Sequence, residues 1–151
     1  MSPSPEPKPV ELVVMIAANA EWRVVLEFFK PPVVDSSPFG EFFPLKVGAR
    51  EILLFHCGWG KVAAAAGTQY AIDRWHPELI FNIGTCGGFT GEIKKGEVIL
   101  ARETLIYDIQ ERMGDPGLSL DHYYKVIDLD FLWKPLPQKV RITRLVSADQ
   151  D

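Results

Sequence analysis

The fold is decided by three pieces of sequence, Cys57-Gly-Trp-Gly-Lys-Val-Ala-Ala-Ala-Ala-Gly67, Pro77-Glu-Leu-Ile-Phe-Asn-Ile-Gly-Thr-Cys-Gly-Gly-Phe89 and Lys94-Lys-Gly-Glu-Val-Ile-Leu-Ala101. In each of the first two, a turn containing glycines follows an apolar run that is typical of a buried strand. Glycines at such positions bring backbone N–H groups to the ends of strands, where α/β proteins build their ligand sites. The stretch therefore predicts an α/β domain with a binding site at the carboxyl ends of its strands.

Strand-like and helix-like segments alternate along the rest of the chain. Leu12 to Ala17 is continuously apolar, as in a strand buried on both faces, and Glu21 to Lys30 has helical spacing and stops at Pro31-Pro32. The alanine-rich run from Lys61 to Trp75 predicts a second helix. Further strands are predicted over Phe42 to Val47, with Pro44 limiting this one to a sheet edge, and over Glu51 to Phe55, Leu79 to Ile83, Glu97 to Thr104 and Val140 to Val146. The fold class is α/β, with three α/β/α layers around a mixed, mostly parallel central sheet.

Composition excludes several classes of protein. The chain has 151 residues and 47% hydrophobic content, enough for one core, and a net charge of −4 gives no basic surface for a nucleic acid. Cys57 and Cys86 lack the spacing of a zinc site or a redox pair, so we expect free thiols, no metal and a reducing compartment. No apolar run is long enough to span a bilayer, and residues 1–11 form a proline-rich tail expected to be disordered. We interpret the protein as cytoplasmic, with no membrane partner.

Individual residues leave a structural and a functional interpretation open. Glu21 lies in the first turn of a helix, where a carboxylate is favourable whether or not it is catalytic. Gly58 belongs to a Gly-x-Gly turn without the spacing of a nucleotide-binding P-loop. Thr85, Cys86 and Gly87 follow a buried strand, either as a tight turn or as a place where backbone approaches a flat ligand. Cys86 as a nucleophile is disfavoured because no histidine has a supporting position.

The order and spacing of these pieces resemble the nucleoside phosphorylase and nucleosidase superfamily, and within it the 5'-methylthioadenosine/S-adenosylhomocysteine nucleosidases. The resemblance implies that Glu21 activates the attacking water and that Thr85, Cys86 and Gly87 contact the nucleoside. It also implies that Gly58 lines the ribose site and that Asp149, in the segment Val146-Ser-Ala-Asp149, belongs to the substrate site. Relatives follow this segment with a phenylalanine that stacks on the base, whereas this chain has Asp151.

The implied activity is hydrolysis of the N-glycosidic bond with release of adenine, without metal or organic cofactor, by a homodimer. A phosphate-dependent phosphorylase and a non-catalytic nucleoside-binding protein are the alternatives. Hydrolysis is preferred because Ala17 to Glu21 lacks the Gly-Asp-Pro-x-Arg phosphate loop of the phosphorylases. The general acid and the glutamate that holds the ribose belong, in relatives, to the last third of a longer domain. We therefore expect residues 12–151 to be the N-terminal portion of a single, incomplete domain that is inactive alone.

Overall fold

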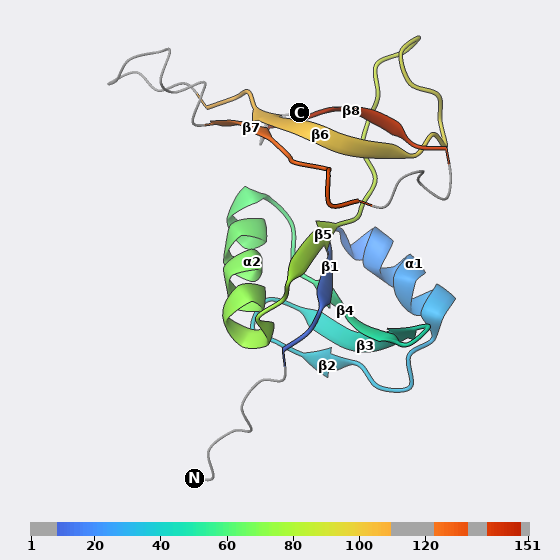
Figure 1. Cartoon of the computed structure of the whole chain (residues 1–151), viewed down its shortest axis with the longest axis vertical. Coiled ribbons are helices and arrows are strands. Elements are labelled where there is room, and N and C mark those ends of the chain that lie inside the picture. The colour runs from blue at the N-terminus through green and yellow to red at the C-terminus, as the bar shows by residue number, and fades with distance from the viewer. Residues whose placement is uncertain (1–8, 110–122, 133–138, 149–151) are drawn as a thin grey trace. The chain divides into compact units, whose positions relative to one another are not determined.

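The computed structural model describes residues 9–109, 123–132 and 139–148, and it divides into two compact units, Met1–Cys86 and Gly87–Asp151 (Figure 1). The division of the sequence into a tail and one domain stays a prediction. Val10 and Glu11, at the end of the predicted tail, make backbone hydrogen bonds to Trp75 and Leu79 respectively. Among the described residues, no helix has the length and apolarity to cross a membrane.

The first unit contains a five-stranded sheet in the order β2-β3-β4-β1-β5. Its central strand β1 pairs in parallel with β4 and β5, as the continuously apolar sequence of β1 predicts. The strands β3 and β4 form the predicted antiparallel hairpin. The bounds are β1 Leu12–Ile16, β2 Asp35–Ser36, β3 Glu41–Val47, β4 Arg50–His56 and β5 Leu79–Asn82.

One prediction about this sheet was wrong. Pro44 was expected to limit its strand to a sheet edge, but β3 lies between β2 and β4. The short β2 pairs only with Glu41 and Phe42, so it does not reach Pro44. The side of the strand where proline lacks an N–H donor therefore carries no ladder partner at that residue.

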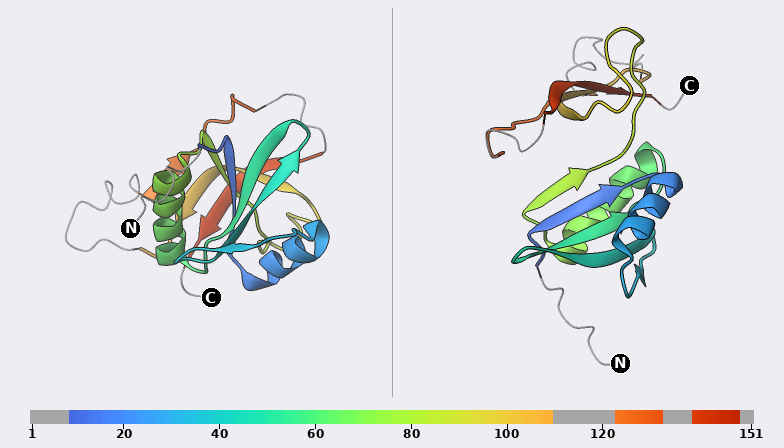
Figure 2. Two further views of the ribbon diagram at one scale, coloured as in Figure 1. Left: turned by 90° about the horizontal axis from the view of Figure 1, so that it is seen from below. Right: turned by 90° about the vertical axis from the view of Figure 1, so that its right-hand side faces the viewer.

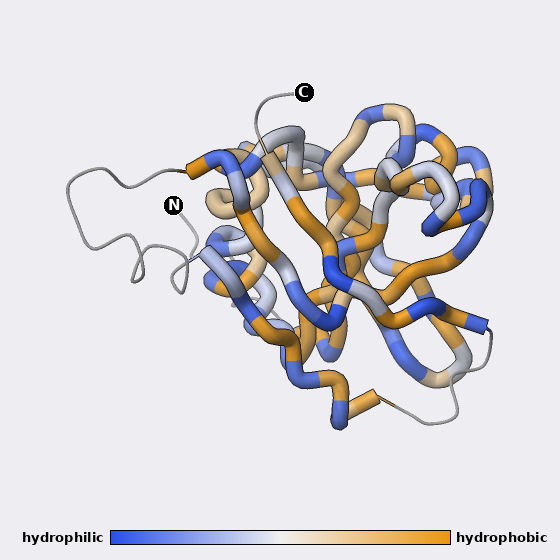
Figure 3. Tube along the Cα trace, turned by 90° about the horizontal axis from the view of Figure 1, so that it is seen from above, coloured by the Kyte–Doolittle hydropathy of each residue, from blue (hydrophilic) through white to orange (hydrophobic). Residues whose placement is uncertain are grey.

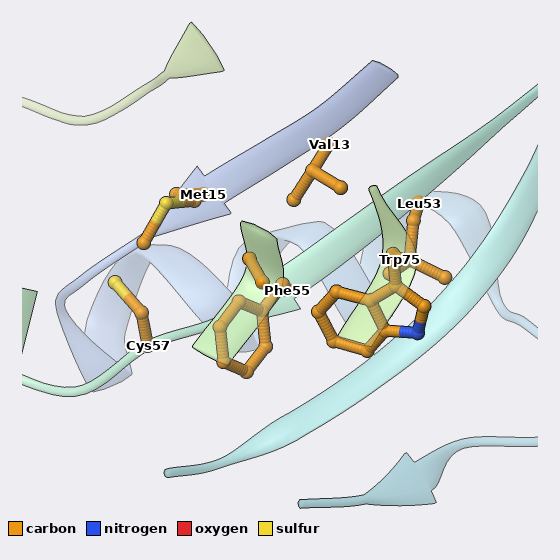
Figure 4. Packing of buried hydrophobic residues seen from close by; sticks show 7 residues of the cluster. Val13, Met15, Leu53, Phe55, Cys57 and Trp75 are labelled. Carbon is orange, nitrogen blue, oxygen red and sulfur yellow. The ribbon is translucent and has the colours of Figure 1, made fainter. Parts of the chain in front are cut away.

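Two helices cover opposite faces of the five-stranded sheet, α1 (Asn19–Phe29) on one face and α2 (Lys61–Trp75) on the other (Figures 1 and 2). Alternate residues of β1 point to opposite faces. Val13 and Met15 pack in a cluster with Phe55 and Trp75, which Figure 4 shows, whereas Val14 and Ile16 pack with the buried Trp22. The predicted three-layer α/β/α arrangement is confirmed by these two clusters.

The helices end where the prolines predict. Lys30 and His76 adopt left-handed backbone conformations at the two C-termini, each directly before a proline. The first helix begins two residues earlier than predicted, at Asn19 rather than Glu21, because Ala18 takes the N-cap position with an extended backbone. Glu21 is therefore the third residue of the helix.

The second unit contains a three-stranded sheet in the order β7-β6-β8. Its strands are β6 (Ile99–Ile106), β7 (Tyr124–Val126) and β8 (Arg141–Ser147), with β6 parallel to β8 and antiparallel to β7. Half-buried and exposed residues alternate from Arg141 to Val146 in β8. This alternation is typical of a strand with one covered face. Figure 3 shows that hydrophobic and hydrophilic residues are interspersed along the chain trace.

Arg144 of β8 contacts both other strands of this second sheet. The Arg144 guanidinium donates to Glu103 Oε2 through Nε at 2.8 Å and lies over the Tyr124 ring at 5.6 Å from its centroid. The hydrogen bond from Arg144 is the main reason why the pKa of Glu103 is lowered. Cross-strand contacts of this kind stabilise the observed pairing of the strands.

Candidate functional site

Glu21 is placed at the start of α1 by its own helix. The N-cap residue, Ala18, makes no side-chain cap hydrogen bond, and the Glu21 carboxylate instead accepts a hydrogen bond from the Ala18 backbone N–H. A glutamate at the third helical position commonly reaches back in this way, and it also faces the positive end of the helix dipole. The structural role that the sequence left open for Glu21 is therefore real.

The same carboxylate is also bound by the segment that follows β5. Thr85 donates two hydrogen bonds to Glu21 Oε1, from its backbone N–H at 2.6 Å and from its hydroxyl at 2.7 Å. The chain is led there by Ile83, whose N–H donates to the Met15 carbonyl at 2.9 Å and extends the pairing of β5 beyond its last residue. Two predicted site residues, 64 positions apart, are thus brought together at the carboxyl ends of adjacent parallel strands.

Gly84 belongs to the run of small residues predicted to form a site, but the sequence assigned it no role of its own; in the structure it lies against the same carboxylate. A Cβ atom at this position would lie 3.0 Å from Oε2 and 3.2 Å from Oε1 of Glu21. The only signal in the sequence was its membership of the run of small residues after β5. That run of small residues predicts that another group approaches the backbone closely, but it does not indicate that this group is the Glu21 side chain.

The pKa of Glu21 is set by opposing effects. Partial burial raises it, whereas the hydrogen bonds from the Thr85 hydroxyl, the Thr85 N–H and the Ala18 N–H lower it. The three donors together outweigh burial, so the pKa lies below the ordinary value of 4.5. The carboxylate is therefore ionised at neutral pH and able to accept a proton.

We predict that Glu21 makes the stability of the first unit depend on acid pH. Because its pKa is lower in the folded than in the unfolded chain, it stabilises the fold above the unfolded value and this stabilisation is lost as pH falls through the folded value. The free energy of unfolding, measured in urea from neutral pH to below 4.5, should therefore fall more in the wild type than in Glu21→Gln.

Glu103 also has a lowered pKa but belongs to the second unit, so Glu103→Gln is the matched control for this experiment. It should leave the decline in stability of the first unit as large as in the wild type. A decline with pH in Glu21→Gln as large as in the wild type would contradict the assigned contribution of Glu21.

The remaining predicted residues are placed as follows. Gly58 follows β4 with φ +81, and a Cβ there would lie 3.4 Å from that of Ala63, so the position favours glycine for backbone reasons. Cys86 is exposed, and Gly87 begins the second unit. Asp149 lies outside the described residues. Among the predicted site residues within the described ranges, only Glu21 and Thr85 are joined to each other by a hydrogen bond.

Both cysteines are free thiols, as predicted. Cys57 is buried behind α2, and burial raises the pKa of its thiol. A Cβ added to Gly67 of that helix would lie 2.9 Å from the Cys57 Cβ, so Cys57 serves packing between helix and sheet. Within the described ranges, no three His, Cys, Asp or Glu side chains are grouped so that they could hold a metal ion.

Several known proteins are similar in sequence to this chain. The chain is 34% identical over 95 residues to the 5'-methylthioadenosine/S-adenosylhomocysteine nucleosidase of Maridesulfovibrio salexigens, an alignment that covers 62% of this chain and 41% of that protein. The alignment with the nucleosidase of the same name from Marinomonas is 28% identical over 101 residues and covers 66% and 44%. The chain thus spans about two fifths of the length of these curated relatives.

Solved structures show the same fold. The Campylobacter jejuni 5'-methylthioadenosine/S-adenosylhomocysteine nucleosidase aligns with a TM-score of 0.72 at 18% identity, over 93% of this chain and 66% of that one. The Streptococcus pneumoniae nucleosidase, solved with the transition-state inhibitor MT-ImmA, aligns with a TM-score of 0.68 at 15% identity, over 91% and 64%. Residues 11–135 match the family described as the phosphorylase superfamily. The chain therefore belongs to the phosphorylase superfamily.

Proposed function

We propose that the complete protein is a purine nucleosidase that hydrolyses the N-glycosidic bond of 5'-methylthioadenosine or S-adenosylhomocysteine and releases adenine. The observation that carries the proposal is the Glu21 carboxylate, held by Thr85 at the carboxyl ends of β1 and β5. The names of the curated relatives support the same activity. Hydrolysis is favoured over phosphorolysis because an ionised carboxylate at this place would repel phosphate.

The chemistry requires a base close to the attacking water. As the bond between C1' and the purine nitrogen breaks, its electron pair goes to the purine and positive charge develops on the ribose ring. Water forms the new bond to C1' and transfers its proton to a carboxylate, and the leaving purine takes a proton from a general acid. We assign the first of these roles to Glu21, which is ionised at neutral pH and needs no cofactor for it.

The other predicted residues complete the proposal. We propose that Thr85, Cys86 and Gly87 contact the nucleoside, that Gly58 lines the ribose side and that Asp149 belongs to the same site. We also propose that the protein is a homodimer, that it acts in the cytoplasm and that its substrate is a small-molecule nucleoside. These assignments come from the resemblance of the motifs to those of the nucleosidases.

The test is adenine release from 5'-methylthioadenosine, with and without phosphate, by the product of the intact gene and by the 151-residue chain. We expect phosphate-independent release by the former and none by the latter. A requirement for phosphate would replace the proposal by a phosphorylase. Binding of the nucleoside without any release by the intact product would replace it by a binding protein. Activity of the short chain would overturn the assignment of the general acid to a later segment.

A further inference from the structure

We infer that Gly84 and Thr85 form a cradle that positions the Glu21 carboxylate, and that Thr85 acts on the reaction through Glu21. The inference rests on the proposed function and deepens it, because it gives Thr85 a different role from the nucleoside contact proposed above. It also adds Gly84 to the site. Both residues are positioning residues in this account.

The first observation is the number of donors that Thr85 directs to one oxygen atom. Its N–H and its hydroxyl both bond to Glu21 Oε1, at 2.6 and 2.7 Å. Hydrogen bonds from neutral donors to an ionised carboxylate are stronger than those between neutral groups. A pair of donors on one oxygen fixes the rotation of the carboxylate as well as its charge. The Thr85 hydroxyl, engaged with Glu21, is thus already used for a purpose other than ligand binding.

The second observation is the space left by the missing side chain of Gly84. The hypothetical Cβ would lie 3.0, 3.2 and 3.4 Å from Oε2, Oε1 and Cδ of Glu21, so it faces the whole carboxylate group. Gly84 has no left-handed backbone conformation, so the close approach of the carboxylate is the reason that the structure gives for glycine at this position. A side chain at this position would require the carboxylate to shift by a few tenths of an ångström.

The third observation is that both sides of the contact are rigidly held. Trp22, the neighbour of Glu21, is 4% exposed, and its Nε1 donates to Glu41 Oε2 at 2.7 Å. On the other side, Ile83 is hydrogen-bonded to Met15 of the central strand. The backbones that carry Glu21 and Thr85 are therefore fixed by the fold, and the cradle sets the orientation of the side chain between them.

The cradle is tested in the 151-residue chain by following the Glu21 carboxyl carbon through a pH titration with nuclear magnetic resonance. Thr85→Val removes the hydroxyl donor and should raise the pKa of Glu21, whereas Thr85→Ser should retain the wild-type titration. Gly84→Ala should also raise the pKa, because a Cβ there crowds the carboxylate and misaligns it with its Thr85 donors. Gly87→Ala is the matched control for this titration, since a Cβ there meets no atom within 4 Å.

The amide spectrum of each variant reports its fold. An unchanged Glu21 titration in a folded Thr85→Val chain would overturn the inference, and if Gly84→Ala does not fold, the Thr85 pair of variants still decides it.

Activity gives a second, separable readout in the product of the intact gene. Loss of one hydrogen bond to a charged group corresponds to about a tenfold or greater loss in kcat for Thr85→Val. The loss should appear in kcat with little change in KM, and Thr85→Ser should restore it. A rise in KM alone would show that Thr85 only contacts substrate and would overturn the positioning role. If the wild type releases no adenine, the proposed function fails, but the titration still tests the cradle.

Discussion

Replacing Glu21 by glutamine should lower kcat for adenine release by about 10²- to 10⁴-fold, the usual contribution of a general base. Glutamine retains an oxygen that can accept the hydrogen bonds from Thr85, so the first helix and the end of β5 should stay connected. The change removes the negative charge and the ability to take a proton from water. We therefore expect a folded, inactive variant, with the loss in kcat rather than in KM.

The measurement is steady-state adenine release by the product of the intact gene, with thermal unfolding followed in parallel. Glu27→Gln is the matched control, because this substitution removes the same charge from an exposed position of the same helix. It should leave kcat unchanged. Full activity of Glu21→Gln would remove Glu21 from the mechanism, whatever its effect on stability.

Phe55→Ala is expected to have the largest effect on stability, about 3–5 kcal/mol of unfolding free energy. The Phe55 side chain is fully buried in the cluster between the sheet and α2, with its ring centroid 5.2 Å from that of Trp75. Truncation would remove this aromatic contact and leave a cavity between β4 and the helix. A unit with so small a core has few means of filling it.

Urea unfolding of the 151-residue chain, followed by far-ultraviolet circular dichroism, measures this loss. Phe28→Ala is the matched control, since Phe28 is 77% exposed on α1, and its truncation should change the free energy of unfolding by about 0.5 kcal/mol or less. Equal losses for the two variants would show that the cluster around Phe55 does not hold the first unit together.

Elements with strong local patterns were predictable from the sequence. The apolar run of β1, the prolines after both helices and the alanine-rich α2 each determine local structure by themselves, and the structure confirms them. The strands β2 and β7 were not predicted, because two or three residues carry no periodicity and form strands only through their partners.

The site was predictable in its parts but not in its connections. Glu21 and Thr85 were chosen for their positions at a helix start and after a strand. Thr85 donates its N–H and its hydroxyl hydrogen to Glu21, 64 residues away in the sequence. This contact depends on the pairing of β5 with β1, which the sequence does not reveal. The role of Gly84 was not predicted for the same reason, since the group it accommodates is a side chain from a distant segment.

Because Glu21 caps its helix through Ala18 and also joins the two ends of the first unit through Thr85, natural selection would retain it for either reason. A descendant that had lost catalysis would still suffer from mutation of this residue. The presence of the glutamate in a homologous sequence is therefore weak support for enzymatic activity in that homologue. Searches for inactive members of the superfamily should instead examine catalytic residues that do not also stabilise the fold.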